Sequence, residues 1–138
     1  MHRISKLLAK LNYLFFKCFI PGSAQIGSGT RIAYGGIAVV IHSHATIGRD
    51  CVIGQCVTLG AKEPFASQDV HASPKVGDNV YIAAGAKLLG GIEIGHSSVI
   101  AANAVVTKSV PPHSIVAGIP AKIIGQTADD YRAIVTHG

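Results

Sequence analysis

The sequence has no tryptophan and few aromatic residues of any kind. It holds 4 Tyr and 4 Phe among 138 residues, yet 49% of its residues are hydrophobic and 14% are charged. This composition excludes a disordered chain, and the length is that of one domain. No apolar run reaches the roughly 20 residues that a membrane span needs. The core must therefore be built from Ile, Val, Leu and Ala.

Acidic residues are absent from the first third of the chain, and the first one in the sequence is Asp50. Six basic residues precede it: Arg3, Lys6, Lys10, Lys17, Arg31 and Arg49. The remainder holds 6 basic and 7 acidic residues and is close to neutral, so the net charge of +5 originates in this region. Such a region favours an anionic ligand or surface. Nucleic acid is not expected as a partner, because the basic residues are not interleaved with aromatic ones and no binding motif is present.

Cysteine is also scarce. Cys18, Cys51 and Cys56 make an odd count, and no CxxC pair occurs. This pattern favours free thiols in a reducing compartment over a disulfide framework or a zinc site. We therefore expect a cytoplasmic protein without a bound metal.

Residues 1–19 are predicted to form an amphipathic helix. Six apolar residues repeat with the spacing of one helical face: Ile4, Leu7, Leu8, Leu11, Phe15 and Cys18. The basic residues of this segment fall outside that face. Pro21-Gly22 ends the helix. A secretory signal is not expected, because Lys10 and Lys17 interrupt the apolar stretch. Two interpretations stay open: the helix packs on this protein or a partner subunit, or it lies on an anionic membrane surface at the inner face of the membrane.

A six-residue period runs through the rest of the chain. Aliphatic residues occupy its first position: Ile20, Ile26 and Ile32, then, after a shift of three, Ile41, Ile47, Ile53 and Leu59, and after an insertion Val76, Ile82, Leu88, Ile94, Ile100 and Val106. The second position is often Gly and the fifth is small or β-branched. Hexapeptide repeats are typical of β-helices, in which three units close one triangular coil. The aliphatic residues then point to the axis, and glycine allows the turns.

Three further segments resemble the hexapeptide-repeat acyltransferases, in particular serine O-acetyltransferases and surface-polysaccharide O-acetyltransferases. They are Ala45–Gly60, which ends in VTLG, Val80–Gly90 with AAGAKLLG, and Val110–Lys122 with VPPH and AGIPAK. The resemblance covers residues 20–125. It implies an all-β fold, a left-handed parallel β-helix, with a loop insertion over residues 60–75. Residues 126–138 are expected to form a C-terminal tail with a short helix.

The resemblance also implies a homotrimer that binds acetyl-CoA in a groove between neighbouring subunits. Family members bind this donor mostly through backbone, which corresponds here to Ala84, Gly85, Ala102 and Gly118. Lys108 and Lys122 are candidates for the nucleotide phosphates, with a solvated role for each as the alternative.

Acetyl transfer to a hydroxyl needs a base with a pKa near the working pH, and histidine is the usual choice. Serine acetyltransferases carry an Asp-His pair where this chain has Ala33 and Tyr34. Tyr34 is therefore a site candidate at the usual histidine position, within an outward bulge over Tyr34–Gly36. The favoured base is His42, in the segment VVIH that polysaccharide-type relatives share. The alternative for His42 is a surface turn residue.

Two other histidines remain candidates. His71 lies in the loop insertion, which in the family reaches over a neighbouring active site, so that it acts as base or acceptor ligand. His44 is a weaker candidate, and Asp69 or Glu63 could orient a histidine.

The sequence thus predicts an acetyl-CoA-dependent O-acetyltransferase, with a sugar of a surface polysaccharide as the expected acceptor. The alternatives are a serine O-acetyltransferase of cysteine biosynthesis and a catalytically silent β-helical scaffold. A zinc hydratase of the γ-carbonic anhydrase type is disfavoured, because its GHxxxLHG motif is absent after Ile94.

Overall fold

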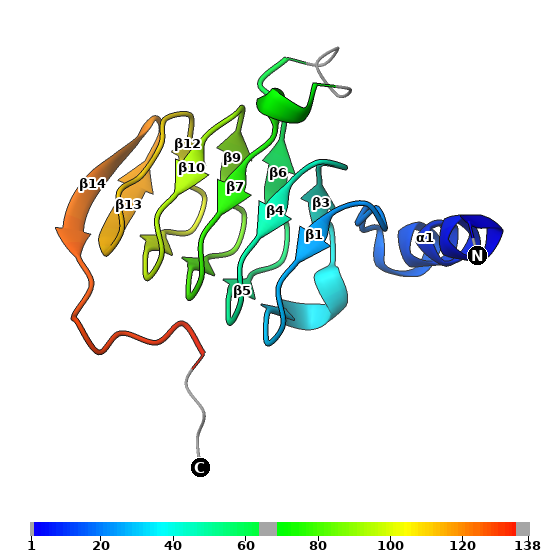
Figure 1. Cartoon of the computed structure of the whole chain (residues 1–138), viewed down its shortest axis with the longest axis horizontal. Coiled ribbons are helices and arrows are strands. Elements are labelled where there is room, and N and C mark those ends of the chain that lie inside the picture. The colour runs from blue at the N-terminus through cyan, green and yellow to red at the C-terminus, as the bar shows by residue number, and fades with distance from the viewer. Residues whose placement is uncertain (1, 64–68, 135–138) are drawn as a thin grey trace.

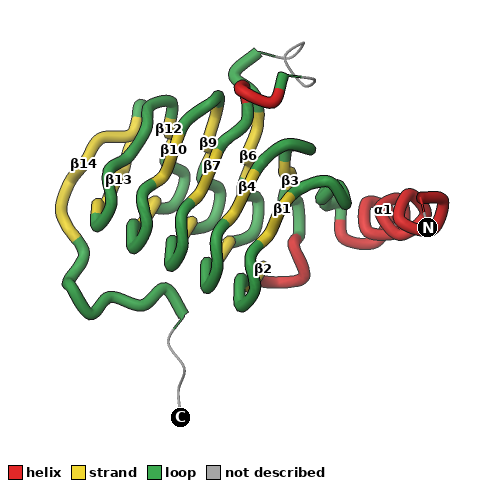
Figure 2. Tube along the Cα trace, in the orientation of Figure 1, coloured by secondary structure: helices red, strands yellow, loops and turns green. Residues whose placement is uncertain are grey.

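The computed structural model describes residues 2–63 and 69–134. One helix, α1 (His2–Phe16), precedes a prism of short strands that coil around one axis (Figure 1). The strands form three sheets, one on each side of the prism, and turns join them at its edges (Figure 2). The chain is therefore a β-helix, as the six-residue period predicts.

Parallel pairing organises all three sheets. The first sheet contains β1 (Gln25–Ile26), β4 (Thr46–Ile47), β7 (Lys75–Val76) and β10 (Glu93–Ile94). The second contains β2 (Arg31–Ile32), β5 (Val52–Ile53), β8 (Tyr81–Ile82), β11 (Val99–Ile100), β13 (Ser114–Gly118) and β14 (Ala121–Gln126). The third contains β3 (Val40–Ile41), β6 (Thr58–Gly60), β9 (Lys87–Leu89) and β12 (Val105–Val106). The exception is β14, which pairs antiparallel with β13 and closes the last coil, a hairpin that the repeat does not predict.

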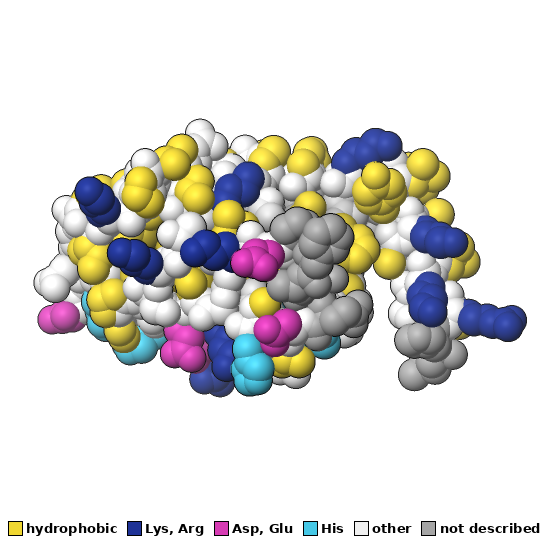
Figure 3. Space-filling model, turned by 90° about the horizontal axis from the view of Figure 1, so that it is seen from above, with side chains coloured by type: hydrophobic (Ala, Val, Ile, Leu, Met, Phe, Trp, Pro, Cys, Tyr) yellow, Lys and Arg dark blue, Asp and Glu magenta, His cyan; other side chains and the backbone are white. Residues whose placement is uncertain are grey.

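Helix α1 extends from the N-terminal end of the prism and stays exposed. Its predicted apolar residues Leu7 and Phe15 are 57% and 71% exposed. Cys18, two residues after the helix, is buried in the coil instead. Hydrophobic and basic side chains lie side by side over this helix (Figure 3). Among the described residues, no helix has the length and apolar character to cross a membrane.

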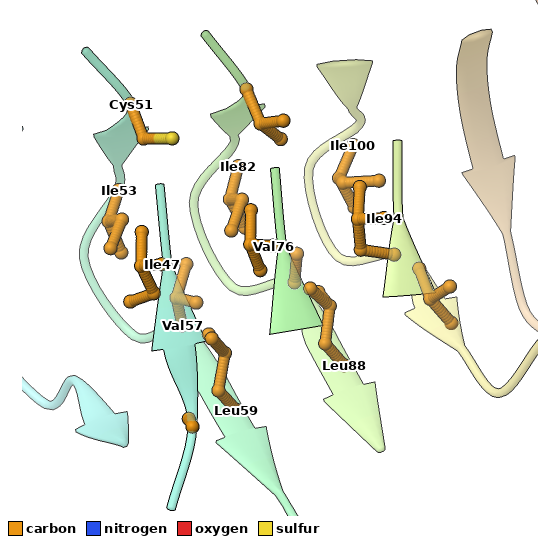
Figure 4. Close-up of a cluster of buried hydrophobic side chains, with 14 of the residues drawn as sticks. Ile47, Cys51, Ile53, Val57, Leu59, Val76, Ile82, Leu88, Ile94 and Ile100 are labelled. Carbon is orange, nitrogen blue, oxygen red and sulfur yellow. The ribbon is translucent and has the colours of Figure 1, made fainter. Parts of the chain in front are cut away.

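From Ile41 on, aliphatic residues at the first repeat position form the core, one column behind each sheet (Figure 4). In the first coil Ile20 and Ile32 are only partly buried and Ile26 is 37% exposed, because β1 and β2 stand at the ends of their sheets. In the second sheet, Ile32, Ile53, Ile82, Ile100 and Val116 follow one another in register. Ile82, in the middle of this column, is fully buried. The fifth positions are buried as well, over most units: Ala45, Cys51, Val57, Val80, Ala86, Ile92, Ser98, Ala104 and Val110. Stacked aliphatic and small side chains therefore fill the interior, without a large aromatic side chain among the core residues described.

The second-position glycines are needed for a reason other than the one expected. Gly48 and Gly54 have no left-handed backbone conformation. Instead, a Cβ at Gly48 would lie 2.6 Å from the carbonyl carbon of Gly77 in the next coil, and one at Gly54 would lie 2.7 Å from the nitrogen of Ala84. The glycines thus allow adjacent coils to approach, whereas the turns themselves use left-handed residues such as Asp50 and Asn79.

The turns form three edges of the prism. The loop edge joins the third sheet to the first and contains residues 42–45, 61–63, 69–74, 90–92 and 107–109, whereas residues 64–68 of the predicted insertion lie outside the described residues. The tail edge joins the first sheet to the second and contains residues 27–30, 48–51, 77–80, 95–98 and 111–113. The bulge edge joins the second sheet to the third and contains residues 33–39, 54–57, 83–86 and 101–104.

The C-terminal tail corrects one expectation. Gln126 ends strand β14, and the described residues 127–134 contain turns and bends instead of a helix. The reason is that Asn79 takes backbone groups which a helix would use. Its side-chain nitrogen donates to the carbonyl of Tyr131 at 2.9 Å, and its side-chain oxygen accepts from the backbone nitrogen of Ala133 at 2.7 Å. Residues 135–138 of the predicted helix lie outside the described residues.

Candidate functional site

The loop edge brings three of the candidate histidines into one hydrogen-bonded region. His42 and His44 occupy the turn after β3, with ring centroids 5.7 Å apart. His71 lies in the short 3-10 helix Val70–Ala72 of the insertion between β6 and β7. The turn of His42 and His44 and the insertion that carries His71 therefore lie on one edge of the same chain. The sequence instead predicts that His71 reaches the His42 site across a subunit boundary.

Buried Ser73 links the turn to the insertion. Its hydroxyl lies 3.0 Å from the carbonyl of His44 and 2.9 Å from that of Val70, and it donates to these acceptors. On the other side of the short helix, the carboxylate of Asp69 accepts from the backbone nitrogen of His71 at 2.8 Å. Asp69 thus orients the His71 backbone and not its ring. These bonds fix the base of the insertion on the turn of His42 and His44.

Neither ring nitrogen of His42 is free to contact solvent, because one accepts a hydrogen bond and the other is buried. Nδ1 accepts a hydrogen bond from the backbone nitrogen of His44 at 3.2 Å. A neutral ring that accepts at Nδ1 carries its hydrogen on Nε2. Nε2 is buried and has no hydrogen-bond partner in the described part of the chain. Burial lowers the pKa of His42, and the nearby His44 lowers it further, so both favour the neutral ring.

The His71 side chain, by contrast, is exposed. It borders a hollow of about 250 Å³ whose other lining residues are Ser73, Lys75, Gly91, Ile92 and Glu93. A Cβ at Gly91 would collide with the carbonyl oxygen of His71, so the insertion packs directly on this glycine. A lysine and a glutamate at the rim give the hollow charges of both signs. His71 is thus a reachable proton acceptor on a backbone that is held at both ends of the short helix.

The bulge edge carries a different set of candidates. Tyr34 is 74% exposed in a 3-10 segment, Ala33–Gly36, and has a φ of 51°. The predicted outward bulge is therefore confirmed. Ala84, Gly85 and Ala102 lie along the same edge, where the backbone nitrogen of Asn103 donates to the carbonyl of Ala84 at 2.9 Å.

Gly118 and the two lysines complete the candidate set for the acyl donor. Gly118 ends β13 and follows the pair Ile100–Val116 by two residues, as Ala102 does, so it continues the bulge edge. Lys122 is exposed on β14 and pairs with Ala117. Lys108 is exposed at the turn after β12, on the loop edge. The six donor candidates therefore do not form one site within a single chain, because Lys108 lies across the third sheet from the bulge edge.

The same separation applies to the catalytic candidates. His42 and His71 lie on the loop edge, whereas Tyr34 lies on the bulge edge. The third sheet, with β3, β6, β9 and β12, stands between these edges. In the described ranges, no group of three or more His, Cys, Asp or Glu side chains could hold a metal ion.

Sequence reasoning missed Ser73, the residue that joins the two parts of the loop edge. A buried serine in a polar insertion has no signal of its own. The adjacent Pro74-Lys75-Val76 marks the return to the repeat, but only the stacking of coils reveals that Ser73 lies against the carbonyl of His44.

A family model and a curated relative both match this chain. Residues 73–108 match the family model described as bacterial transferase hexapeptide (six repeats). A serine acetyltransferase of Mycobacterium tuberculosis strain H37Rv is 48% identical over 107 residues, which are 78% of this chain and 44% of that protein. The chain spans about half the length of the curated relatives that it matches.

Solved structures agree with the sequence comparison. A serine acetyltransferase in complex with cysteine superposes with a TM-score of 0.84 at 33% identity, over 94% of this chain and 49% of that one. A serine acetyltransferase of Brucella abortus strain S19 in complex with coenzyme A superposes with a TM-score of 0.79 at 34% identity, over 92% of this chain and 54% of that one. The left hand expected for the β-helix is confirmed by this likeness.

Proposed function

The chain carries the left-handed hexapeptide-repeat β-helix of the serine acetyltransferases, and on this premise we propose that it transfers an acetyl group from acetyl-CoA to a hydroxyl. The observation that carries the proposal is the superposition of 92% of the chain on an enzyme solved with coenzyme A. Because the chain spans about half of such relatives, its activity, acceptor and assembly are proposals.

Serine is the acceptor to test first. The relatives described above are named for serine, which favours it over the surface-polysaccharide sugar that was expected from the sequence. A sugar hydroxyl remains the second candidate for one reason. Ala33 and Tyr34 occupy the positions where serine acetyltransferases carry their Asp-His pair, so this chain lacks part of the machinery that the resemblance implies.

For the proton transfer we propose His71 as the base and His42 as a positioning residue, whereas the sequence favours His42 as the base and gives His71 as base or acceptor ligand. His71 is exposed beside a polar hollow. His42 has its Nδ1 occupied by His44 and its Nε2 buried, so its ring must turn before either nitrogen can accept a substrate proton. Through the bond to His44, and that of Ser73 to the His44 carbonyl, His42 instead supports the insertion that carries His71.

The proposed reaction balances without a further reactant. The acceptor oxygen attacks the carbonyl carbon of the thioester while the His71 ring takes the hydroxyl proton. The tetrahedral intermediate then breaks its carbon–sulfur bond. The thiolate of coenzyme A leaves and takes the proton back from the imidazolium. The products are an acetyl ester and the free thiol of coenzyme A.

We propose a homotrimer as the working form, because two edges of the prism must meet. The backbone candidates Ala84, Gly85, Ala102 and Gly118 follow the bulge edge, whereas His71 lies on the loop edge. A neighbouring subunit supplies the missing edge to each site. Lys108, which shares the loop edge with His71, then approaches the donor from the neighbour, while Lys122 lies on the subunit that holds the donor backbone.

Activity is tested by following release of the coenzyme A thiol when serine is added to the purified chain and acetyl-CoA. His71→Ala should lower kcat by ~10²-fold or more, the usual scale for loss of a general base. The matched control is His96→Ala, which removes a histidine from the tail edge and should leave turnover within about twofold of the parent. Equal turnover of the parent chain and His71→Ala would refute the assignment.

Two substitutions separate the roles of His42. Asn places an amide near the position of Nδ1 and can keep the bond from His44, whereas Gln extends toward the position of Nε2 and cannot. If His42 acts as a positioning residue, His42→Asn should retain most of the turnover and its pH profile, and His42→Gln should lose about tenfold or more. If both variants lose ~10²-fold and the neutral-pH limb of the profile, His42 is the base after all.

A further inference from the structure

Helix α1 exposes an apolar face that nothing in the described chain covers. Ile4, Leu7, Leu8, Leu11, Leu14 and Phe15 are all exposed. With about 100° of rotation per residue, these six side chains fall within roughly 120° of the helix circumference. The helix is nevertheless fixed to the coil at its end, where the backbone nitrogen of Ala38 donates to the carbonyl of Phe16 at 3.3 Å and Phe19 pairs with Val40.

The basic residues of α1 flank this apolar face instead of lying opposite it. On the same rotation, Arg3, Lys6 and Lys10 form a stripe of roughly 60° that begins next to Leu14. Lys17 follows directly after the helix, so four cations lie within fifteen residues. None has an acidic residue nearby in the sequence, because the first carboxylate is Asp50. Basic and hydrophobic side chains accordingly lie next to one another over the helix in Figure 3.

We propose that α1 lies on an anionic lipid surface, with its apolar face among the acyl chains and its basic stripe at the phosphate groups. Long lysine and arginine side chains at the flank of a buried face can extend to the level of the headgroups. An interfacial helix needs this combination of an apolar face and neighbouring positive charge. The inference is independent of the proposed acetyl transfer, since α1 contributes no residue to the loop or bulge edge candidates.

Charge favours lipid over a second copy of this chain as the occupant. If the apolar faces of two helices packed together, their basic stripes would approach one another. No carboxylate within residues 1–49 could neutralise them. An anionic lipid surface supplies the opposite charge, worth ~1 kcal/mol per basic residue near the surface, which is about fivefold in binding.

The test is flotation of the purified full-length chain with large unilamellar vesicles. Vesicles of phosphatidylglycerol and phosphatidylcholine should carry the protein upward, vesicles of phosphatidylcholine alone should carry much less, and added salt should release it. Lys6→Gln/Lys10→Gln should weaken binding to the anionic vesicles by about 25-fold, because two basic contacts are removed. Failure to float with the anionic vesicles would overturn the proposal.

A matched pair of substitutions tests the orientation of the helix. Leu11 lies at the centre of the apolar face and Asn12 about 100° away, and both are exposed. Leu11→Glu and Asn12→Glu add the same charge, so they share the electrostatic loss of about fivefold. Leu11→Glu should lose at least a further tenfold, because the burial of one leucine is removed. Equal binding of the two variants, or a change of oligomeric mass in Leu11→Glu without vesicle binding by the parent, would contradict the proposal.

Discussion

The coil and helix α1 use the same kinds of side chain with opposite results. Ile82 is fully buried because Ile53 and Ile100 lie in register on either side of it. Leu11 is 40% exposed, since α1 projects beyond the prism and has no layer against it (Figure 1). Aliphatic content alone therefore does not decide burial. A repeat that stacks on itself supplies its own neighbours, whereas one isolated helix needs a partner.

The largest expected difference between the two regions is the loss of stability when an aliphatic side chain is shortened to alanine. Ile82→Ala should lower the free energy of unfolding by about 2–5 kcal/mol, because it leaves a cavity between two stacked residues. Leu11→Ala should change it by less than about 0.5 kcal/mol, since little buried area is lost and alanine favours helix. Urea unfolding followed by circular dichroism measures both. Similar losses would mean that α1 packs on the coil in solution.

Glycine substitutions compare the stacked coils with the linker that joins α1 to the first coil. Gly48→Ala should cost about 1–3 kcal/mol, because the new Cβ meets the backbone of Gly77 at 2.6 Å and the coils must separate. Gly22→Ala, in the linker after α1, adds the same atom in open space and should be close to neutral. Thermal denaturation of the two variants is the check. A Gly48→Ala chain as stable as the parent would refute close coil contact as the reason for glycine.

The two terminal segments provide a finer comparison. Side-chain bonds from Asn79 hold the tail on the prism, whereas α1 is fixed to the prism only at its C-terminal end. Asn79→Asp removes the donor to the Tyr131 carbonyl and should weaken tail docking by about 1–2 kcal/mol. Cleavage by trypsin after Arg132 should accelerate accordingly, by roughly tenfold. Asn103→Asp makes the same change at another left-handed turn, away from the tail, and serves as control. Equal cleavage rates would show that Asn79 does not hold the tail.

The smallest effect concerns alkaline pH. Burial raises the pKa of Tyr131 to about 12, with smaller contributions from Tyr81 and Cys51. The docked tail keeps the phenol protonated, so its stabilisation is complete below pH ~10 and is lost as the pH rises toward 12. Tyrosinate absorbance should show one late-titrating phenol, absent in Tyr131→Phe. Titration of all four tyrosines near pH 10 would contradict a docked tail.

The repeat made the fold predictable, and the coil follows from it over most of its length. Aliphatic residues such as Ile47 and Leu88 are buried where the period puts them. The sequence predicts that Gly48 allows a turn, whereas the structure shows that it allows adjacent coils to approach. The distance between coils depends on residues far apart in the sequence. The prediction of a helix in the tail was wrong for a related reason, because the conformation of the tail depends on Asn79, about fifty residues earlier.

The candidate site was less predictable than the fold. The sequence identified His42 and His71 as candidate histidines for the base. It did not indicate which edge of the prism each one occupies, because this depends on where the repeat shifts and where the chain resumes the repeat after the insertion. It also could not indicate that the His44 backbone occupies Nδ1 of His42. Such facts belong to the stacking of coils, and they change which histidine is the better candidate for the base.

One measurement tests the central claim most directly: the rate at which the purified chain releases the thiol of coenzyme A from acetyl-CoA in the presence and absence of serine. The account predicts release that depends on serine, saturates with both substrates and falls by ~10²-fold or more in His71→Ala. A chain that folds as this coil yet releases no thiol with serine or with any sugar hydroxyl offered would contradict it.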